Sequence, residues 1–265
     1  DLPDRLVLTK PPGWEVHDQH VGRQLLSFCQ AISANRWPIL RDRGHSCGFL
    51  HRLDVPSSGI VLLAKTYEAF YDLLVQLRAG EVARDYIVLC HGWVPPGLRE
   101  IDAPVYWSGK QQTKAGGQGR PSRTHLKLMA HASNAGDGFS LVAIRIATGR
   151  RHQIRSHFSH VGHSTVCDGK YTVPATFQSD LRLCSQNFLH RYRLAFKDAA
   201  GILREAVEPL PADLVSALRR LTPRGGGSRG AVRQWLASSG PRDWKECAPL
   251  SGRSDAVRRR PAPAA

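Results

Sequence analysis

One carboxylate in this 265-residue chain stands where a catalytic acid could be held rigidly. Asp54 ends the tetrapeptide HRLD (51–54), two residues after Arg52. A Pro/Ser/Gly turn (55–59) follows, and then the apolar run IVLLA (60–64), which predicts a buried strand. Folds commonly present catalytic groups on loops that a rigid element positions. We therefore take Asp54 as the leading catalytic candidate.

A second polar cluster, TGRRHQIRSH (148–157), follows another apolar run. Its later part predicts a helix on which Ile154 and Phe158 form part of a buried stripe, while Arg151 and Arg155 share a different face. A guanidinium beside a buried carboxylate lowers the pKa of that carboxyl group and fixes its geometry. This arrangement could aim Arg155 into a cleft.

Together the two clusters resemble the motifs of the RluA-type RNA pseudouridine synthases, which read roughly H-R-L-D-x-x-T-S-G and T-G-R-x-H-Q-I-R-x-H. LVLTKPPG (6–13) looks like the opening strand and turn of that family, and VARDYIV (82–88) looks like the strand that carries its active-site Tyr. The segments at 162–171 and 188–190 follow in the family's order, so the resemblance covers about residues 5–215.

Four positions depart from the family pattern. Ser57 stands where Thr is usual, Arg84 where Lys is usual, Cys167 where Gly is usual, and Arg191 where a small residue is usual. None of them alters the Asp, the Tyr or the Arg of the Gln-Ile-Arg triplet. We therefore expect an active enzyme rather than an inactive homologue.

The resemblance implies that Asp54 acts at the sugar carbon of a uridine, with Arg155 as its ion-pair partner. Tyr86 matches the Tyr that stacks on the uracil, and Arg52 matches the Arg that fills the gap left by a flipped base. An Arg suits this task because its planar group can stack on bases and bond their edges. We expect the RNA also to be contacted by His51, Arg150, His152 and Gln153. The chemistry requires neither a metal nor an organic cofactor.

The charge of the chain agrees with an RNA substrate. Lys and Arg number 37 against 22 Asp and Glu, so the net charge is +15 and the pI is about 10.1. Residues 223–265 contribute +6 of this, which leaves +9 on the rest. No apolar run approaches the length of a membrane span. We expect a monomer that binds ribosomal or transfer RNA and no membrane.

The pattern of strands and helices predicts an α+β fold, with a mixed, mostly antiparallel sheet flanked by helices and the catalytic cleft across the sheet. Strands are expected at residues 5–9, 60–64, 82–90, 124–129, 139–146 and 188–196, and a helix at 67–77 that Thr66 caps. The catalytic domain should span 1–222. Residues 223–265 are rich in Gly, Pro and Arg and predict a largely disordered tail with one short helix at 232–236.

Six cysteines lie far apart without a C-x-x-C pair, which indicates free thiols in a reducing compartment inside the cell, either the cytoplasm or an organelle. The chain begins at Asp1 rather than Met, so targeting cannot be read from it.

Other functions remain open at this stage. The chain could be an RNA-binding protein that kept the fold and lost turnover. Gly116-Gly117-Gln118 is also similar to the loop of peptide release factors and peptidyl-tRNA hydrolases. Zinc binding by the histidines at 152, 157, 160 and 163 lacks a Cys pair or carboxylate at ligand spacing. Which RNA and which uridine are modified lies beyond the sequence.

Overall fold

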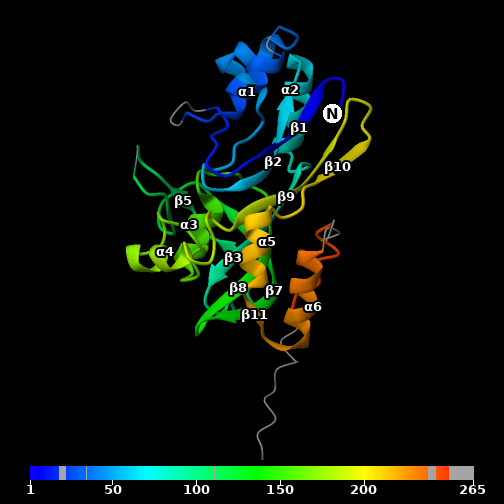
Figure 1. Ribbon diagram of the computed structural model, residues 1–265. Coiled ribbons are helices and arrows are strands. Elements are labelled where there is room, and N and C mark those ends of the chain that lie inside the picture. Colours follow the sequence, from blue (N-terminus) through cyan, green and yellow to red (C-terminus); the bar gives the residue numbers. More distant parts are fainter. Residues whose placement is uncertain (18–21, 34, 110, 238–242, 251–265) are drawn as a thin grey trace, which may run out of the picture.

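A single large sheet organises the chain (Figure 1). The computed structural model describes residues 1–17, 22–33, 35–109, 111–237 and 243–250. Within these residues the sheet has nine strands in the order β1-β2-β9-β3-β8-β7-β11, with β10 paired to β9 and β4 paired to β7. The pairing of β2 with β9 is parallel and the other pairings are antiparallel. The mixed, mostly antiparallel sheet expected from the sequence is confirmed.

The strands are bounded as follows: β1 (Arg5–Lys10), β2 (Ser58–Ala64), β3 (Ala83–His91), β4 (Glu100–Asp102), β5 (Val105–Tyr106), β6 (Lys114–Ala115), β7 (Arg123–Asn134), β8 (Asp137–Ile146), β9 (Leu189–Lys197), β10 (Leu203–Val207) and β11 (Thr222–Pro223). The helices are α1 (Leu25–Ser33), α2 (Tyr67–Arg78), α3 (Gln153–His160), α4 (Pro174–Asp180), α5 (Ala212–Arg219) and α6 (Gly225–Leu236), with 3-10 turns η1 (Pro38–Arg41) and η2 (Arg43–Gly48).

Each strand predicted from the sequence is present, although the ends move. The largest change is in β7, which continues to Asn134 because it forms a long hairpin with β8. Helix α2 begins as expected, since the Thr66 hydroxyl accepts a hydrogen bond from the Ala69 amide at 3.2 Å. Gly80, with φ of +75°, lies just beyond its end.

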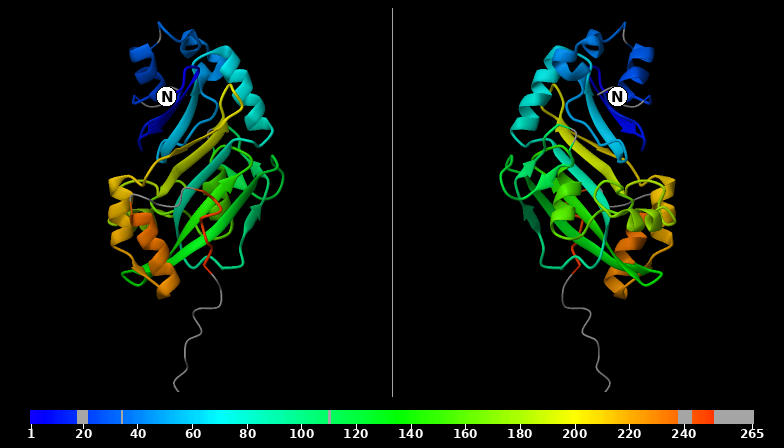
Figure 2. Two further views of the ribbon diagram at one scale, coloured as in Figure 1. Left: turned by 90° about the vertical axis from the view of Figure 1, so that its right-hand side faces the viewer. Right: turned by 90° about the vertical axis from the view of Figure 1, so that its left-hand side faces the viewer.

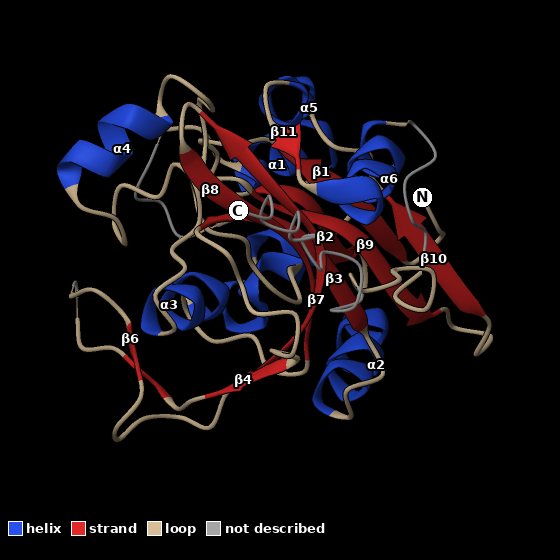
Figure 3. Ribbon diagram, turned by 90° about the horizontal axis from the view of Figure 1, so that it is seen from below, coloured by secondary structure: helices blue, strands red, loops and turns tan. Residues whose placement is uncertain are grey.

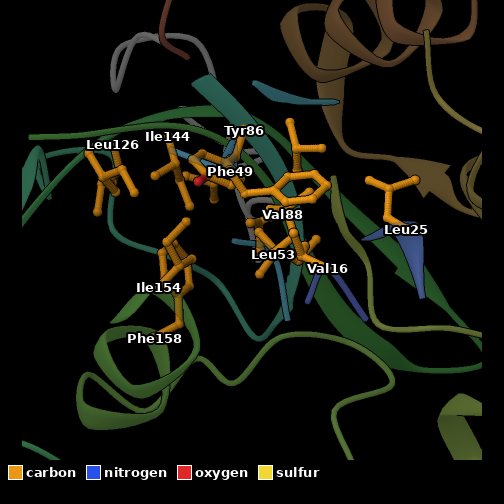
Figure 4. Close-up of a cluster of buried hydrophobic side chains, with 14 of the residues drawn as sticks. Val16, Leu25, Phe49, Leu53, Tyr86, Val88, Leu126, Ile144, Ile154 and Phe158 are labelled. Carbon is orange, nitrogen blue, oxygen red and sulfur yellow. The ribbon is translucent and has the colours of Figure 1, made fainter. Parts of the chain in front are cut away.

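Successive side chains of β3 point to opposite faces of the sheet and so belong to different cores. Tyr86 and Val88 join one apolar cluster, which α1 and α3 cover, whereas Ile87 and Leu89 join a second cluster, which α5 and α6 cover. Figure 4 shows Ile154 and Phe158 of α3 beneath the strand residues of the first cluster. Figure 3 shows α3 on one side of the sheet and α5 and α6 on the other.

Helix α2 packs in a third cluster with β1 and β2 at the end of the sheet that carries the amino terminus. Figure 2 shows β9, in yellow, running between this blue and cyan part and the green strands. Strand β9 therefore joins the two parts of the sheet, and the elements on either side of it meet there. Within the described residues, no helix is long and apolar enough to cross a membrane.

Helix α6 differs from the largely disordered tail that composition predicts for 223–265. It packs on the sheet, and Val232 and Trp235 are buried. These residues lie three positions apart and share one helix face, a signal that the surrounding Gly and Arg residues dilute. The Trp235 ring meets the Tyr192 ring edge-on at 4.9 Å between centroids. A division at residue 222 stays a prediction, and residues 251–265 lie outside the described part.

We predict that Trp235→Ala lowers the free energy of unfolding by about 3 to 5 kcal/mol, because it empties a large buried site. Urea denaturation would measure this. Gln234→Ala is the matched control, since Gln234 is exposed on the same helix and its loss should cost about 0.5 kcal/mol or less. Equal stability of the two variants would show that α6 contributes nothing to the core.

Candidate active site

The loop that carries Asp54 is fastened to the start of the chain. The Gly13 amide donates to the Val55 carbonyl at 2.8 Å, and the Ser57 amide closes the turn onto the Asp54 carbonyl at 3.0 Å. Buried Lys10 donates to the carbonyls of Pro11 and Trp14, both at 2.8 Å, and more weakly to Val55 at 3.3 Å. The Lys-Pro-Pro-Gly turn therefore serves as the anchor of the Asp54 loop.

The ion pair expected between Asp54 and Arg155 is present. The Arg155 Nη1 atom lies 3.0 Å from Asp54 Oδ2. Its other donors hold Asp168 in a two-pronged pair, with Nε 2.7 Å from Oδ2 and Nη2 2.6 Å from Oδ1. Asp168 is itself bonded by the Thr165 hydroxyl and the Lys170 amide, each at 3.1 Å. Asp168 thus fixes the guanidinium of Arg155 through two nitrogens and leaves Nη1 to contact Asp54.

Asp168 was missed as a site residue in the sequence, where it counted only as part of a matching segment. One signal was available. A guanidinium has five donor hydrogens in a rigid fork, and a single carboxylate at 54 leaves most of them without an acceptor. A buried Arg155 therefore needs a second acceptor, but spacing alone does not say which acidic residue supplies it.

The electrostatics of the site keep Asp54 ionised. Burial raises the pKa of its carboxyl group, but the charges of Arg155 and Arg52 and the hydrogen bond from Arg155 help to outweigh burial, so the pKa is lowered from its ordinary value. The His152 Nε2 atom lies 3.9 Å from Asp54 Oδ1. Burial lowers the pKa of His152 to about 4, so this ring is neutral near pH 7. The carboxylate at 54 is thus anionic at neutral pH.

Tyr86 faces the same site from β3. Its side chain is buried, and its hydroxyl accepts a hydrogen bond from Arg191. Arg52, next to the Asp54 loop, is exposed and reaches the same cleft. The structure therefore brings together the residues to which the sequence assigned the central roles.

A cleft of about 1360 Å³ runs past these groups. Of the residues with described positions, its lining includes seven arginines but one carboxylate, that of Asp54. The arginines are Arg52, Arg78, Arg84, Arg150, Arg151, Arg155 and Arg191. The cleft is therefore strongly cationic, as a groove for a polyanion would be.

Gln153 lines the cleft, and the RNA contact expected for it stays a prediction. It is buried, and its amide donates to the Arg123 carbonyl at 3.0 Å and accepts from the Thr148 hydroxyl at 2.8 Å and the Arg150 amide at 3.0 Å. It thus ties the loop before α3 to β7. His51 and Arg150 line the cleft, and the buried Nε atom of Arg150 has no hydrogen-bond partner among the described residues.

Two of the four histidines considered for zinc contact backbone carbonyls instead. His157 contacts the Ala103 carbonyl at 2.9 Å, and His163 contacts the His91 carbonyl at 2.8 Å. Among the residues with described positions, no group of three or more His, Cys, Asp or Glu side chains could hold a metal ion. Gln118 of the Gly-Gly-Gln loop is exposed and lies outside the cleft lining.

We predict that Arg155→Met raises the pKa of Asp54, because burial remains when the opposing charge is removed. Carbon-13 NMR of the Asp side chains as a function of pH would measure the pKa of Asp54. In the wild type, a lowered folded-state pKa gives stability that is present above the unfolded value of about 3.9 and is lost as the pH falls through the folded value.

Arg151→Met is the matched control, since Arg151 lies just before α3 and donates to the Gly109 carbonyl at 2.8 Å rather than to a carboxylate. It should leave the pKa of Asp54 nearly unchanged. A pKa equally unaffected by Arg155→Met would mean that the ion pair does not control the carboxylate.

Comparison with known proteins places this site in a family. The family model described as RNA pseudouridylate synthase matches residues 4–160. Ribosomal large subunit pseudouridine synthase C of Haemophilus ducreyi is 36% identical over 198 residues, which cover 72% of this chain and 58% of that protein. An uncharacterized RNA pseudouridine synthase of Chloroflexus aurantiacus is 35% identical over 219 residues, which cover 81% of this chain and 66% of that protein. The chain thus spans only part of the length of these relatives.

The fold agrees with these matches. The structure of human RNA Pseudouridylate Synthase Domain Containing 1 is similar with a TM-score of 0.66 at 24% identity, covering 91% of this chain and 94% of that one. At this identity the likeness shows the shared fold. With the sequence match across 4–160, it confirms the resemblance drawn from the two motifs. This chain belongs to the RNA pseudouridylate synthase family.

Proposed function

We propose that the protein converts uridine to pseudouridine in structured RNA, with Asp54 as the catalytic carboxylate. The observation that supports this most is the 3.0 Å contact of Asp54 with buried Arg155 in a cleft lined by arginines. The reaction breaks the bond from C1′ to N1, turns the uracil, joins C5 to C1′ and removes the C5 proton. A carboxylate at C1′ can form an adduct or remove a sugar proton, and both roles require it to be ionised and close.

Arg155 keeps this carboxylate ionised, since it opposes the rise in the pKa of Asp54 that burial causes. Tyr86 is the residue that we place against the uracil ring. The target base must leave its stack to reach Asp54, which leaves a gap in the RNA. We assign the filling of that gap to Arg52, and its exposure two residues before Asp54 supports this.

Ribosomal RNA is the substrate that we propose. Relatives named ribosomal large subunit pseudouridine synthase C support this choice, at 36% identity over 72% of this chain. We propose a monomer in a reducing compartment. In support of the compartment, all six cysteines have described positions and are free and buried. Burial raises the pKa of the Cys90 thiol above its ordinary value and that of Cys29 to about 11, which leaves both thiols unreactive.

Two alternatives make different demands on the chain. A binding protein without turnover would not need an ionised Asp54. A hydrolase that uses the Gly-Gly-Gln loop would need Gln118 at its reacting centre, but Gln118 is exposed outside the cleft lining. The geometry of Asp54 and Arg155 therefore favours the synthase over both.

We predict that Asp54→Asn abolishes pseudouridine formation and changes RNA affinity by about threefold or less, because the amide keeps the shape and loses the charge. Mass spectrometry of ribosomal RNA treated with the purified protein would measure the product. Asp137→Asn is the matched control, since this exposed residue is the first of β8, directly after the turn from β7. Gln118→Ala should also stay active. Pseudouridine formation by Asp54→Asn would rule out the assignment, whereas hydrolysis of peptidyl-tRNA that Gln118→Ala abolishes would favour the hydrolase.

RNA affinity should weaken steeply with salt, because Lys and Arg contacts to phosphate release counterions. Two or three such contacts would lower the affinity about 10- to 50-fold between 50 and 200 mM salt. Filter binding at a series of salt concentrations would measure the slope. An affinity independent of salt would remove the cationic cleft from the account of RNA binding.

A further inference from the structure

Arg191 connects three separate segments around the cleft. It extends from β9 and is 2% exposed. Its Nη1 atom lies 2.7 Å from His51 Nδ1 and 3.1 Å from the Ile60 carbonyl, and its Nη2 atom donates to the Tyr86 hydroxyl. The Arg52 carbonyl lies 3.4 Å from Nη2. One side chain thus bonds the segment just before Asp54, the strand just after it and the strand of Tyr86.

No carboxylate within the described residues forms an ion pair with Arg191, although other buried arginines of this chain have such partners. Arg155 pairs with Asp54 and Asp168, and Arg193 pairs with Asp85 at 2.9 Å. Burying a cation among neutral acceptors alone is costly in free energy. Burial of Arg191 therefore costs folding free energy that a neutral side chain would not cost. Its contacts with cleft residues indicate a functional reason for an arginine at this position.

An irregularity in the sheet aims Arg191 at the cleft. Asp85 pairs with Arg193 but Tyr86 pairs with Arg191, so the register between β3 and β9 skips Tyr192. Such a β-bulge re-aims side chains. Arg193 accordingly contacts Asp85 and Glu205, whereas Arg191 contacts the cleft residues.

The backbone of Arg191 is also enclosed. Gly59 pairs with Arg191 across β2 and β9 and has φ of +121°. A Cβ atom at 59 would lie 2.3 Å from the Arg191 carbonyl oxygen. Only glycine permits this approach. The strand that follows the Asp54 turn is therefore packed directly against the backbone that carries Arg191.

We propose that Arg191 is a positioning residue that sets the Tyr86 phenol and the Asp54 loop relative to one another; this inference rests on the proposed synthase function. Arg191 acts through the two groups that it holds. A guanidinium only donates, so the Tyr86 oxygen and His51 Nδ1 must both accept. His51 therefore carries its proton on Nε2. Burial and the charges of Arg191 and Arg84 hold the pKa of His51 well below its ordinary value, so the ring stays neutral.

The test uses Arg191→Lys and Arg191→Gln, because neither replacement reproduces the planar fork of the guanidinium. Arg193→Lys is the matched control on the same strand, since Arg193 is also buried but contacts carboxylates. We expect both Arg191 variants to lower the single-turnover rate of pseudouridine formation about 10- to 100-fold, with RNA affinity within about threefold of wild type. Arg193→Lys should lose stability and keep its rate per folded molecule.

A double-mutant cycle separates positioning from a merely structural role. If Arg191 acts through Tyr86, adding Tyr86→Phe to Arg191→Lys should reduce the rate much less than Tyr86→Phe does alone. Fully multiplicative effects, or a wild-type rate in Arg191→Lys, would overturn the proposal. So would a failure of both Arg191 variants to fold while Arg193→Lys folds, because Arg191 would then be structural. Absence of product from the wild type would instead reject the synthase function itself.

Discussion

The site depends on one buried guanidinium shared by two carboxylates. Arg155 is 4% exposed and bonds Asp168 with two of its nitrogens and Asp54 with a third. Asp168 is fully buried, whereas the Asp54 side chain is 16% exposed and borders the cleft. The buried carboxylate of Asp168 holds the cation in place, and the cation keeps the Asp54 carboxylate ionised. Removing Arg155 would leave both carboxylates without their partner.

The rest of the fold delivers these three groups to one place. Helix α3 begins directly after His152, whose φ of +51° turns the chain into the helix, and Gln153 ties the preceding loop to β7. Ile154 and Phe158 seat the helix in the apolar cluster under the sheet, so the face with Arg155 is turned to the Asp54 loop. Lys10 fastens that loop from the other side. The distance between Asp54 and Arg155 is thus set by packing of the whole molecule.

The sequence predicts the groups that occur in local patterns. The motifs around Asp54 and Arg155, the cap at Thr66 and the period of the strands were all readable, and the structure confirms the ion pair, the helix start and the mixed sheet. The role of Asp168 was not readable, because its bond to Arg155 depends on how a turn folds back. Arg191 shows the same limit, since its contacts follow from a bulge between β3 and β9. The length and packing of helix α6 were not predicted, because the Gly- and Arg-rich composition of this segment indicates disorder although Trp235 is buried.

The acid limb of the pH–rate profile tests the central claim most directly. The single-turnover rate of pseudouridine formation would be measured against pH for the wild type and for Arg155→Met, which removes the opposing charge. Because Arg155 lowers the pKa of Asp54, the wild-type rate should fall only below the ordinary pH range of an Asp. In the variant the fall should begin at higher pH. Superimposable acid limbs would contradict the account, since they would show that the guanidinium of Arg155 does not lower the pKa of Asp54.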